Sequence, residues 1–156
     1  MRYQELKPEH DAALAELIRA SLKARGLALP GTVYYDKTLD HLSDFYSCPG
    51  RVYYVLMEGD KVIGGIGLAE FEGLTHCCEL QKLYLDDESQ GSGIGYEMIS
   101  FIEAKAREMG YQKMYLETHT NLQTAIHIYE RAGYEEIPRP DSVVHSTMNR
   151  FYLKNL

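Results

Sequence analysis

The chain of 156 residues has no tryptophan, few cysteines and prolines, and fewer basic than acidic side chains. The three cysteines, Cys48 and the adjacent Cys77 and Cys78, are an odd number that does not suit a disulfide framework. Sixteen lysines and arginines against 23 aspartates and glutamates give a net charge of -7, which disfavours a sequence-independent nucleic-acid binder. We therefore expect a protein of the reducing cytoplasm that binds no nucleic acid.

Long apolar runs are absent as well. The first ten residues, MRYQELKPEH, are charged and contain no signal-like core. No run approaches the ~20 apolar residues that a membrane span needs, so we expect neither export nor a membrane partner. With 45% hydrophobic and 25% charged residues, the composition is that of an ordinary globular protein, and we expect residues 1–156 to form a single domain.

The most informative stretch joins a strand pattern to a helix pattern through glycines. Polar and apolar residues alternate over residues 79–85, as in a strand with one buried face. An apolar stripe at helical spacing runs from Ile94 to Met109. Glycine lets the backbone approach a ligand closely, and the first helical turn has unbonded N–H groups, so the junction predicts an anion site. Its sequence is Gln90-Gly91-Ser92-Gly93-Ile94-Gly95.

Two familiar phosphate loops do not fit this junction. A P-loop requires a lysine and a hydroxyl residue after its last glycine, but Tyr96 and Glu97 follow Gly95. The dinucleotide fingerprint requires its third glycine where Tyr96 stands. The pattern that remains is Gln-x-x-Gly-x-Gly, with Gln90, Gly93 and Gly95 in the fixed places. It resembles the acetyl-coenzyme A signature of the GNAT superfamily of N-acetyltransferases.

A second block, residues 116–134, is similar to the same family. It looks like the family's strand-then-helix pattern ending in Ala-Ile-x-apolar-Tyr-x-x-x-Gly-aromatic. The matching residues are Ala125, Ile126, Ile128, Tyr129, Gly133 and Tyr134. One position departs from the pattern, because Leu122 stands where the family often has asparagine, and Asn121 comes one residue earlier. We expect Asn121 to reach the cofactor from the loop.

The order of the expected elements resembles the GNAT fold over essentially the whole chain. Helical patterns cover residues 8–25, a short segment after Asp36, 94–109 and 122–132. Strand patterns cover residues 2–6, 51–57, 62–70, 77–85, 113–118, 134–137 and 148–156. The resemblance implies an α/β (α+β) fold. A mixed, mostly antiparallel sheet of about seven strands is expected to be splayed between its fourth and fifth strands and flanked by four helices.

The resemblance also implies acetyl-coenzyme A (acetyl-CoA) as a co-substrate. In the family, backbone amides of the glycine loop cradle the pyrophosphate, and the open edge of the fourth strand pairs with the pantetheine arm. The expected cofactor-binding residues are Leu83, Tyr84, Leu85, Gln90, Gly91, Ser92, Gly93, Ile94, Gly95 and Asn121. The acidic run 86–88 would repel phosphates, so we expect it to face water.

Acetyl transfer to an amine needs a proton acceptor and a proton donor. An alkyl ammonium of pKa near 10.4 costs roughly 4 to 5 kcal/mol to neutralise at pH 7, so some base must take its proton. The resemblance implies Glu79 as this base; the alternative is an exposed strand glutamate or an ion-pair partner of a lysine. Tyr129 stands where the family places a tyrosine near the cofactor sulfur, and would protonate the departing thiolate. Its alternative is a helix aromatic packed on the sheet.

The sequence says least about the acceptor. Tyr34 and Tyr35 are candidates for an amine-binding wall, although ordinary loop aromatics are an equal interpretation. In the family, a segment corresponding to residues 138–147 forms the opposite wall. The cysteines and His76 lack the paired spacings of a zinc site, so we expect no metal. The last strand, MNRFYLKNL, is a candidate for pairing across a homodimer.

We therefore expect an acetyl-CoA-dependent N-acetyltransferase acting on the primary amine of a small molecule or peptide, by direct transfer in a ternary complex. Two alternatives remain at this point. One is a non-catalytic acyl-CoA sensor or structural module with the same fold, and the other is a nucleotide-binding enzyme. The presence of Glu79 and Tyr129 favours the transferase.

Overall fold

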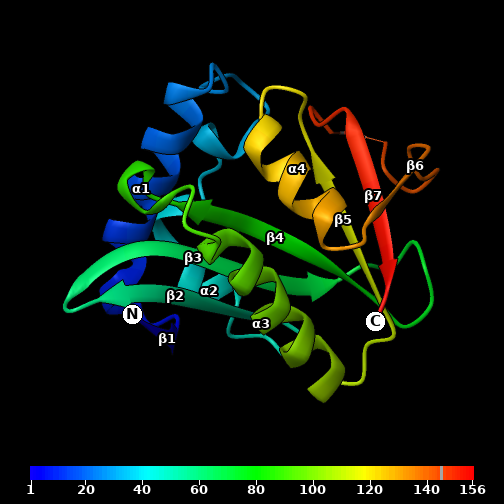
Figure 1. Ribbon diagram of the computed structural model, residues 1–156, viewed down its shortest axis with the longest axis horizontal. Helices are drawn as coiled ribbons and strands as arrows, with labels where there is room; N and C mark the ends of the chain where they lie inside the picture. The colour runs from blue at the N-terminus through cyan, green and yellow to red at the C-terminus, as the bar shows by residue number, and fades with distance from the viewer. Residues whose placement is uncertain (145) are drawn as a thin grey trace.

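The computed structural model describes residues 1–144 and 146–156, and its centre is one mixed sheet of seven strands (Figure 1). The strands are β1 Arg2–Glu5, β2 Val52–Glu58, β3 Lys61–Glu70, β4 Cys77–Leu85, β5 Lys113–Thr118, β6 Glu135–Ile137 and β7 Arg150–Asn155. They lie in the order β1-β2-β3-β4-β5-β7-β6. All neighbours are antiparallel except β4 and β5, which are parallel. The mixed, mostly antiparallel sheet expected from the sequence is confirmed.

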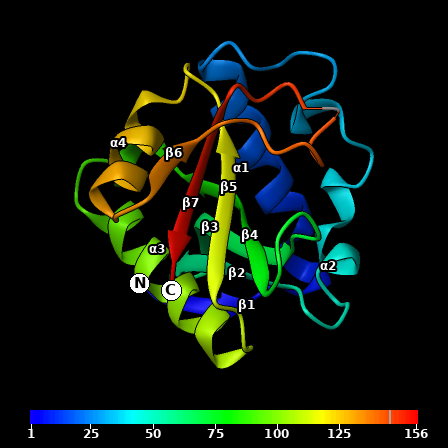
Figure 2. The ribbon, with the colours of Figure 1, turned by 90° about the vertical axis from the view of Figure 1, so that its right-hand side faces the viewer.

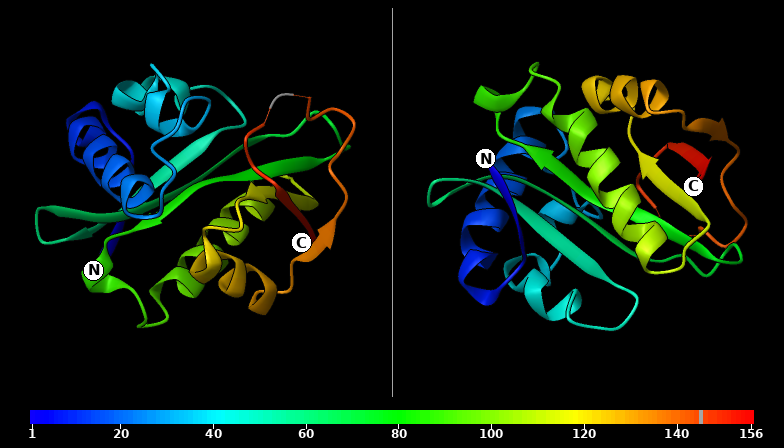
Figure 3. Two further views of the ribbon diagram at one scale, coloured as in Figure 1. Left: turned by 90° about the horizontal axis from the view of Figure 1, so that it is seen from above. Right: turned by 60° about the horizontal axis from the view of Figure 1, so that its bottom comes forward.

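Four α-helices cover the two faces of the sheet, as predicted. They are α1 Asp11–Ala24, α2 Leu42–Phe45, α3 Ile94–Glu108 and α4 Gln123–Arg131. Helices α1 and α2 lie on one face and α3 and α4 on the other (Figure 3). Each face has its own apolar core. The first packs α1 residues such as Leu14 and Ile18 on β2, and the second packs Met98 and Ile102 of α3 on β3, β4 and β5.

Three of the helices end in the same way, with a glycine in the left-handed region. Gly26, Gly110 and Gly133 have φ values of 71°, 92° and 94° and follow α1, α3 and α4. In each case the next N–H reaches back to the carbonyl five residues earlier, as Leu27 does to Leu22 at 2.8 Å. This Schellman closure needs a residue without Cβ strain, which explains the glycines. It also fixes where the loops after α1 and α4 leave the helices.

The sheet opens between β4 and β5. Their pairing covers only Cys77 to Glu79 on β4 and Lys113 to Tyr115 on β5. Beyond this point β4 continues to Leu85 alongside β3, and no strand among the described residues pairs with its other edge. Figure 2 shows β4 and β5 diverging from their shared end. The splay predicted between the fourth and fifth strands is therefore confirmed.

A β-bulge in β4 arises from glycines in β3. A Cβ on Gly65 or Gly67 would lie 2.5 Å or 2.4 Å from the ring of Tyr53, so only glycine leaves room for that ring. The Tyr53 hydroxyl then donates to the carbonyl of Lys82 at 2.7 Å. At this point two β4 residues, Lys82 and the one after it, oppose the single β3 residue Ile66. The bulge changes which side chains of β4 face α1.

Two expectations from the sequence differ from the structure. The predicted helix after Asp36 is a 3-10 turn over Leu39–His41 followed by the four-residue α2. The interruption lies at His41, whose φ and ψ of -137° and 42° are not helical. The homodimer pairing expected through the last strand is wrong, because β7 pairs with β5 on one edge and with β6 on the other.

Within residues 1–144 and 146–156, none of the helices has both the length and the apolar character needed to cross a bilayer.

Candidate active site

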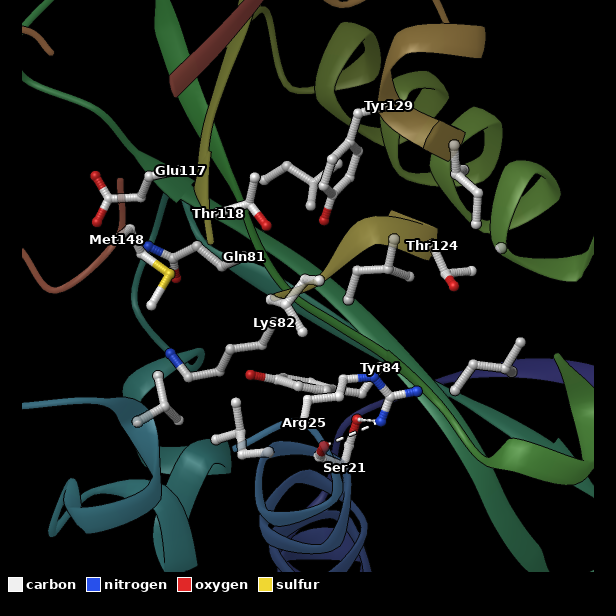
Figure 4. Close-up of a pocket in the computed structure, with 18 of the residues that line it drawn as sticks. Ser21, Arg25, Gln81, Lys82, Tyr84, Glu117, Thr118, Thr124, Tyr129 and Met148 are labelled. Carbon is white, nitrogen blue, oxygen red and sulfur yellow. Dashed lines mark hydrogen bonds between the residues drawn. The ribbon is translucent and has the colours of Figure 1, made fainter. Parts of the chain in front are cut away.

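The strand splay opens into a cavity of about 560 Å³ (Figure 4). Its walls come from the last turn of α1, residues 79–85 of β4, the end of β5 and one side of α4 along its length. The segments 31–33 and 146–148 close one end, and the glycine loop before α3 closes the other. The cavity thus joins the proposed anion loop to the strand that carries Glu79.

The glycine loop presents unbonded N–H groups at one end of this cavity. Gly91 and Gly93 have φ values of 81° and 85°, and a Cβ on either would meet nothing within 4 Å. The main-chain N–H groups of Gly91, Ser92 and Gly93 donate to no acceptor within the described ranges. Because α3 begins at Ile94, its first-turn N–H groups add to them. This geometry suits a phosphate or another anion.

Side chains hold the loop in this shape. The Gln90 amide donates to the carbonyl of Leu85 and to the Asp87 carboxylate, both at 3.1 Å, and so ties the loop to the end of β4. Asp86 accepts from the Ser89 N–H at 3.0 Å and pairs with Lys61 at 3.3 Å. Asp87 and Glu88 are exposed, as expected for acids that must not face a phosphate.

The open edge of β4 forms a second part of the cavity wall. Leu83, Tyr84 and Leu85 all line it. In the part of the chain that the structure describes, no strand pairs with these three residues on the side toward β5, so their backbone donors and acceptors are available to an extended ligand. An arm containing amides can therefore lie along this edge and continue from the glycine loop toward Glu79.

Glu79 lies where the two strands part and lines the cavity. One carboxylate oxygen accepts from the Gln81 amide at 2.9 Å, and the Gln81 oxygen accepts from the hydroxyl of Tyr46 at 2.7 Å. Burial raises the pKa of Glu79 to about 7, with Glu117 adding to the rise and the Gln81 hydrogen bond opposing it. A carboxyl with a pKa near neutrality is suited to accept a proton at physiological pH.

Tyr129 and Thr118 meet on the opposite wall (Figure 4). Tyr129 comes from α4, is 6% exposed and turns its hydroxyl toward Thr118 at the end of β5. Burial raises the pKa of Tyr129, so the phenol stays protonated at neutral pH. Thr118 is 2% exposed, and its Oγ1 has no hydrogen-bond partner within the described ranges. An unpaired buried hydroxyl in a cavity wall indicates a missing polar partner.

Lys82, in the β4 bulge, has an unusual backbone. Its φ is 53°, and a non-glycine residue in this region costs about 1 to 2 kcal/mol. The Tyr53 hydrogen bond to its carbonyl helps to hold this conformation. The side chain is largely buried in the cavity wall, and this burial lowers the pKa of its ammonium. Strain of this kind occurs most often at binding and catalytic sites.

A second carboxylate, Glu117 of β5, lies in the same wall. The Tyr115 hydroxyl donates to its Oε2 and the Ser146 hydroxyl to its Oε1, both at 2.9 Å. These two bonds fix the carboxylate beside the end of the cavity that holds residues 146–148. This end of the cavity therefore contains two carboxyl groups, those of Glu79 and Glu117, and one lysine, Lys82.

The structure brings most of the predicted site residues to the cavity. Glu79, Tyr129, Leu83, Tyr84, Leu85, Gln90, Gly91, Gly93 and Gly95 line it. Ser92 and Ile94 do not, although Ser92 contributes its N–H to the loop; its hydroxyl donates to the Ser89 carbonyl at 2.9 Å. Ile94 is buried in the core under α3.

Three other predicted residues also lie outside the cavity lining. Asn121 is exposed, and its amide donates to the carbonyl of Arg25 at 3.2 Å. The rings of Tyr34 and Tyr35 contact each other with centroids 4.9 Å apart, and Tyr35 is 61% exposed. Thr32 and Val33, just before them, reach the cavity instead.

Several lining residues were not predicted from the sequence. They include Arg25, Lys82, Glu117 and Thr118. Of these residues, Lys82 is the one that the sequence marks locally. Gln81 and Lys82 are adjacent polar residues that break the polar–apolar alternation of the strand, as a bulge does. The others come from elements that meet only in the folded chain.

Cys48, Cys77 and Cys78 are all free thiols. In the part of the chain that the structure describes, no three His, Cys, Asp or Glu side chains are grouped as metal ligands. Burial raises the pKa of Cys77 to about 11 and that of Cys78 to about 12, which makes both poor nucleophiles.

Comparisons with known proteins agree with this geometry. The model of the acetyltransferase (GNAT) family matches residues 15–134. The chain is 37% identical over 136 residues to the "Uncharacterized N-acetyltransferase YjgM" of Escherichia coli strain K12, covering 86% of this chain and 81% of that protein. It is 27% identical over 115 residues to N-acetyltransferase 8 of Homo sapiens, covering 69% of this chain and 51% of the human protein.

Solved structures show the same fold. A GNAT-family acetyltransferase from Staphylococcus aureus Mu50 superposes with a TM-score of 0.86 at 22% identity, over 99% of this chain and 98% of that one. The PaiA N-acetyltransferase from Thermoplasma acidophilum, solved in complex with coenzyme A, superposes with a TM-score of 0.78 at 18% identity and the same coverage.

Proposed function

This chain belongs to the GNAT family of acetyltransferases and is an N-acetyltransferase, and from this premise we propose how its cavity works. Acetyl-CoA is the donor, a primary amine of a small molecule or peptide is the acceptor, and the acetyl group passes directly between them in a ternary complex. The sheet runs from Arg2 to Asn155, so we treat the chain as one catalytic domain. Its free thiols suit the reducing cytoplasm, where we place it.

Two features of the cavity support acetyl-CoA as the donor. Unbonded N–H groups at Gly91, Ser92 and Gly93 would hold the pyrophosphate. The unpaired edge of β4 at residues 83–85 would pair with the amides of the pantetheine arm. A helix N-terminus contributes only about 0.3 to 1 kcal/mol per charge, whereas micromolar affinity needs about 8 kcal/mol, so the edge has to supply much of the binding.

Glu79 accepts the proton of the amine in this proposal. Neutralising an alkyl ammonium costs roughly 4 to 5 kcal/mol at pH 7, and a carboxylate of pKa about 7 can take the proton directly or through one water. The hydrogen bond from Gln81 orients one oxygen and leaves the other for the amine. Tyr46 in turn holds Gln81 in place.

Tyr129 acts on the departing sulfur. As the amine nitrogen forms its bond to the acetyl carbon, the carbon–sulfur bond breaks and its electron pair moves to sulfur. An ordinary phenol has a pKa about 1.5 above that of an alkyl thiol, and burial raises the pKa of Tyr129 further. Because the phenol is the weaker acid, it stays protonated until charge develops on sulfur, to which it then donates a hydrogen bond. The proton follows to sulfur, and solvent returns a proton to the phenolate. The products are an amide and free coenzyme A.

The observation that supports this proposal most strongly is that Glu79, Tyr129, the glycine loop and the open strand edge all meet in one cavity. The test is thiol release from acetyl-CoA with a panel of primary amines, for the wild type and for a variant carrying both Glu79→Gln and Tyr129→Phe. We expect turnover by the wild type and at least a hundredfold loss in the variant. Equal turnover by the two proteins would remove both residues from the mechanism.

A further inference from the structure

We call the end of the cavity that contains Glu79, Glu117 and residues 146–148 the acceptor end. Lys82 is a cation of unusual placement at this end. Its backbone is in the left-handed region, and its carbonyl is fixed by the Tyr53 hydroxyl at 2.7 Å. The fold therefore turns this side chain into the cavity instead of leaving it to alternate along the strand. In Figure 4 the Lys82 ammonium lies on the same side as Gln81, Met148 and Glu117.

Among the residues that the structure describes, no carboxylate forms an ion pair with the Lys82 ammonium. The lysines in ion pairs within the described ranges are Lys61, Lys105 and Lys154. The Nζ of Lys82 lies 5.8 Å from the centroid of the Phe45 ring. Burial lowers the pKa of Lys82, while Asp36 and Glu79 act at longer range to raise it. A largely buried charge without a partner is costly, so this position calls for an anion from the ligand.

The same end of the cavity also offers anions to a cation. Glu79 lines it from β4, and Glu117 is held in it by the hydroxyls of Tyr115 and Ser146. Two carboxylates alone would suit a polyamine, but a second cationic nitrogen would meet Lys82. A ligand that carries an amine and an anion on neighbouring atoms satisfies both signs.

We propose that the acceptor is an α-amino acid, with its amine beside Glu79 and its α-carboxylate paired with Lys82. This inference rests on the proposed function and narrows its acceptor. A carboxylate fits better than a phosphate because, of the described residues, Lys82 is the one cation at this end. Two further cations line the cavity, and each is engaged elsewhere. Arg25 lies beyond Tyr84 in Figure 4 and bonds to Ser21 and Asp87. Arg131, at the end of α4, lies over the ring of Tyr96 at 5.3 Å from its centroid.

Matched substrates isolate the carboxylate. We would measure kcat/KM for a panel of α-amino acids and for the corresponding α-carboxamides, which differ only in the charge of that group. The amine of a carboxamide loses its proton more easily, so its intrinsic reactivity is the higher, and any preference for the acid must come from the enzyme. A hydrogen bond to a charged group predicts a preference of ~10- to 100-fold for the best amino acids.

Variants then assign the preference to Lys82. Lys82→Met should bring the ratio of acid to carboxamide close to one, whereas Lys82→Arg should keep most of it. Lys37→Met, at an exposed lysine that does not line the cavity, is the matched control and should keep the wild-type ratio. Circular dichroism of each variant checks that it is folded.

Two results would overturn the inference. One is a wild type that uses carboxamides as well as or better than the acids, which needs no variant to observe. The other is a Lys82→Met variant that lowers both substrates equally. In either case amines are still acetylated, so the proposed function survives. If no amine releases thiol from acetyl-CoA, the proposed function itself fails, and the inference fails with it.

Discussion

Replacing Glu79 by glutamine should remove activity and increase stability at high pH. Glutamine has the same shape and can still accept from the Gln81 amide, which donates to the Glu79 carboxylate at 2.9 Å. It cannot accept the amine proton, so we expect kcat/KM to fall by about 10²- to 10⁴-fold, the usual contribution of a positioned base. The assay is thiol release from acetyl-CoA with the best amine of the panel.

The pH dependence follows from the raised pKa. As a base, Glu79 works only when deprotonated, so kcat/KM of the wild type should rise with pH through a limb at about 7. The amine adds its own limb near its solution pKa. In Glu79→Gln the limb near 7 should be lost and the limb of the amine should remain.

The effect on stability has a definite sign. The pKa of Glu79 is raised from 4.5 to about 7 on folding, so the folded protein holds this proton more tightly than the unfolded chain. This group's favourable contribution is fully present below pH 4.5 and is lost as pH rises through 7, a change of about 3 kcal/mol in the free energy of unfolding. The free energy of unfolding of Glu79→Gln does not fall in this way, because glutamine does not titrate. It should therefore be more stable than the wild type at pH 8, by up to that amount, and equal to it near pH 4.

Urea unfolding at the two pH values measures this difference. Glu72→Gln is the control, since Glu72 is exposed in the loop before β4, and it should match the wild type in both assays. The reasoning is refuted if Glu79→Gln keeps more than a third of the wild-type kcat/KM and the limb near pH 7. It is equally refuted if the variant is no more stable than the wild type at pH 8.

Three further changes test other parts of the account. Tyr129→Phe should lower kcat by about 10- to 100-fold, seen in thiol release, because the sulfur loses its hydrogen-bond donor; an unchanged kcat would contradict this role. Gly93→Ala should weaken coenzyme A binding at least tenfold, as measured by calorimetry. Gly110 is the control, because it has a similar φ of 92° and equally open surroundings. Gly110→Ala should cost the same backbone strain, about 1 to 2 kcal/mol of stability, without weakening coenzyme A binding. Glu103→Ala should lower the free energy of unfolding by about 3 kcal/mol in urea, because it leaves Lys154 without its partner at 2.8 Å. It should spare kcat/KM, since Glu103 does not line the cavity; a loss of stability under 1 kcal/mol would refute the pair's importance.

Local patterns predicted the parts of this protein that depend on local physics. The Gln90–Gly95 loop is recognisable because its glycines and the helix that follows are adjacent in sequence. The order of strands and helices followed from periodicity. The length of α2 did not, because apolar residues at helical spacing after Asp36 also suit a 3-10 turn followed by one short helix.

The acceptor end was not predictable because it depends on tertiary packing. Lys82 faces the cavity only because the Tyr53 ring lies over Gly65 and Gly67 and bonds to its carbonyl. Glu117 reaches the same place because β5 parts from β4 after Tyr115. Tyr34 and Tyr35 have the side chains expected of an amine-binding wall. The turn at Val33–Tyr35 places Val33 in the cavity lining instead, and neither tyrosine is part of that lining.

Titration of ¹⁵N-labelled protein with coenzyme A, followed by backbone-amide NMR, tests the central claim most directly. We predict the largest shifts at the amides of Gly91, Ser92 and Gly93 and along Leu83–Leu85, since none of the described residues bonds to these groups on the cavity side. Saturable binding that leaves these amides unshifted and moves resonances elsewhere would contradict it.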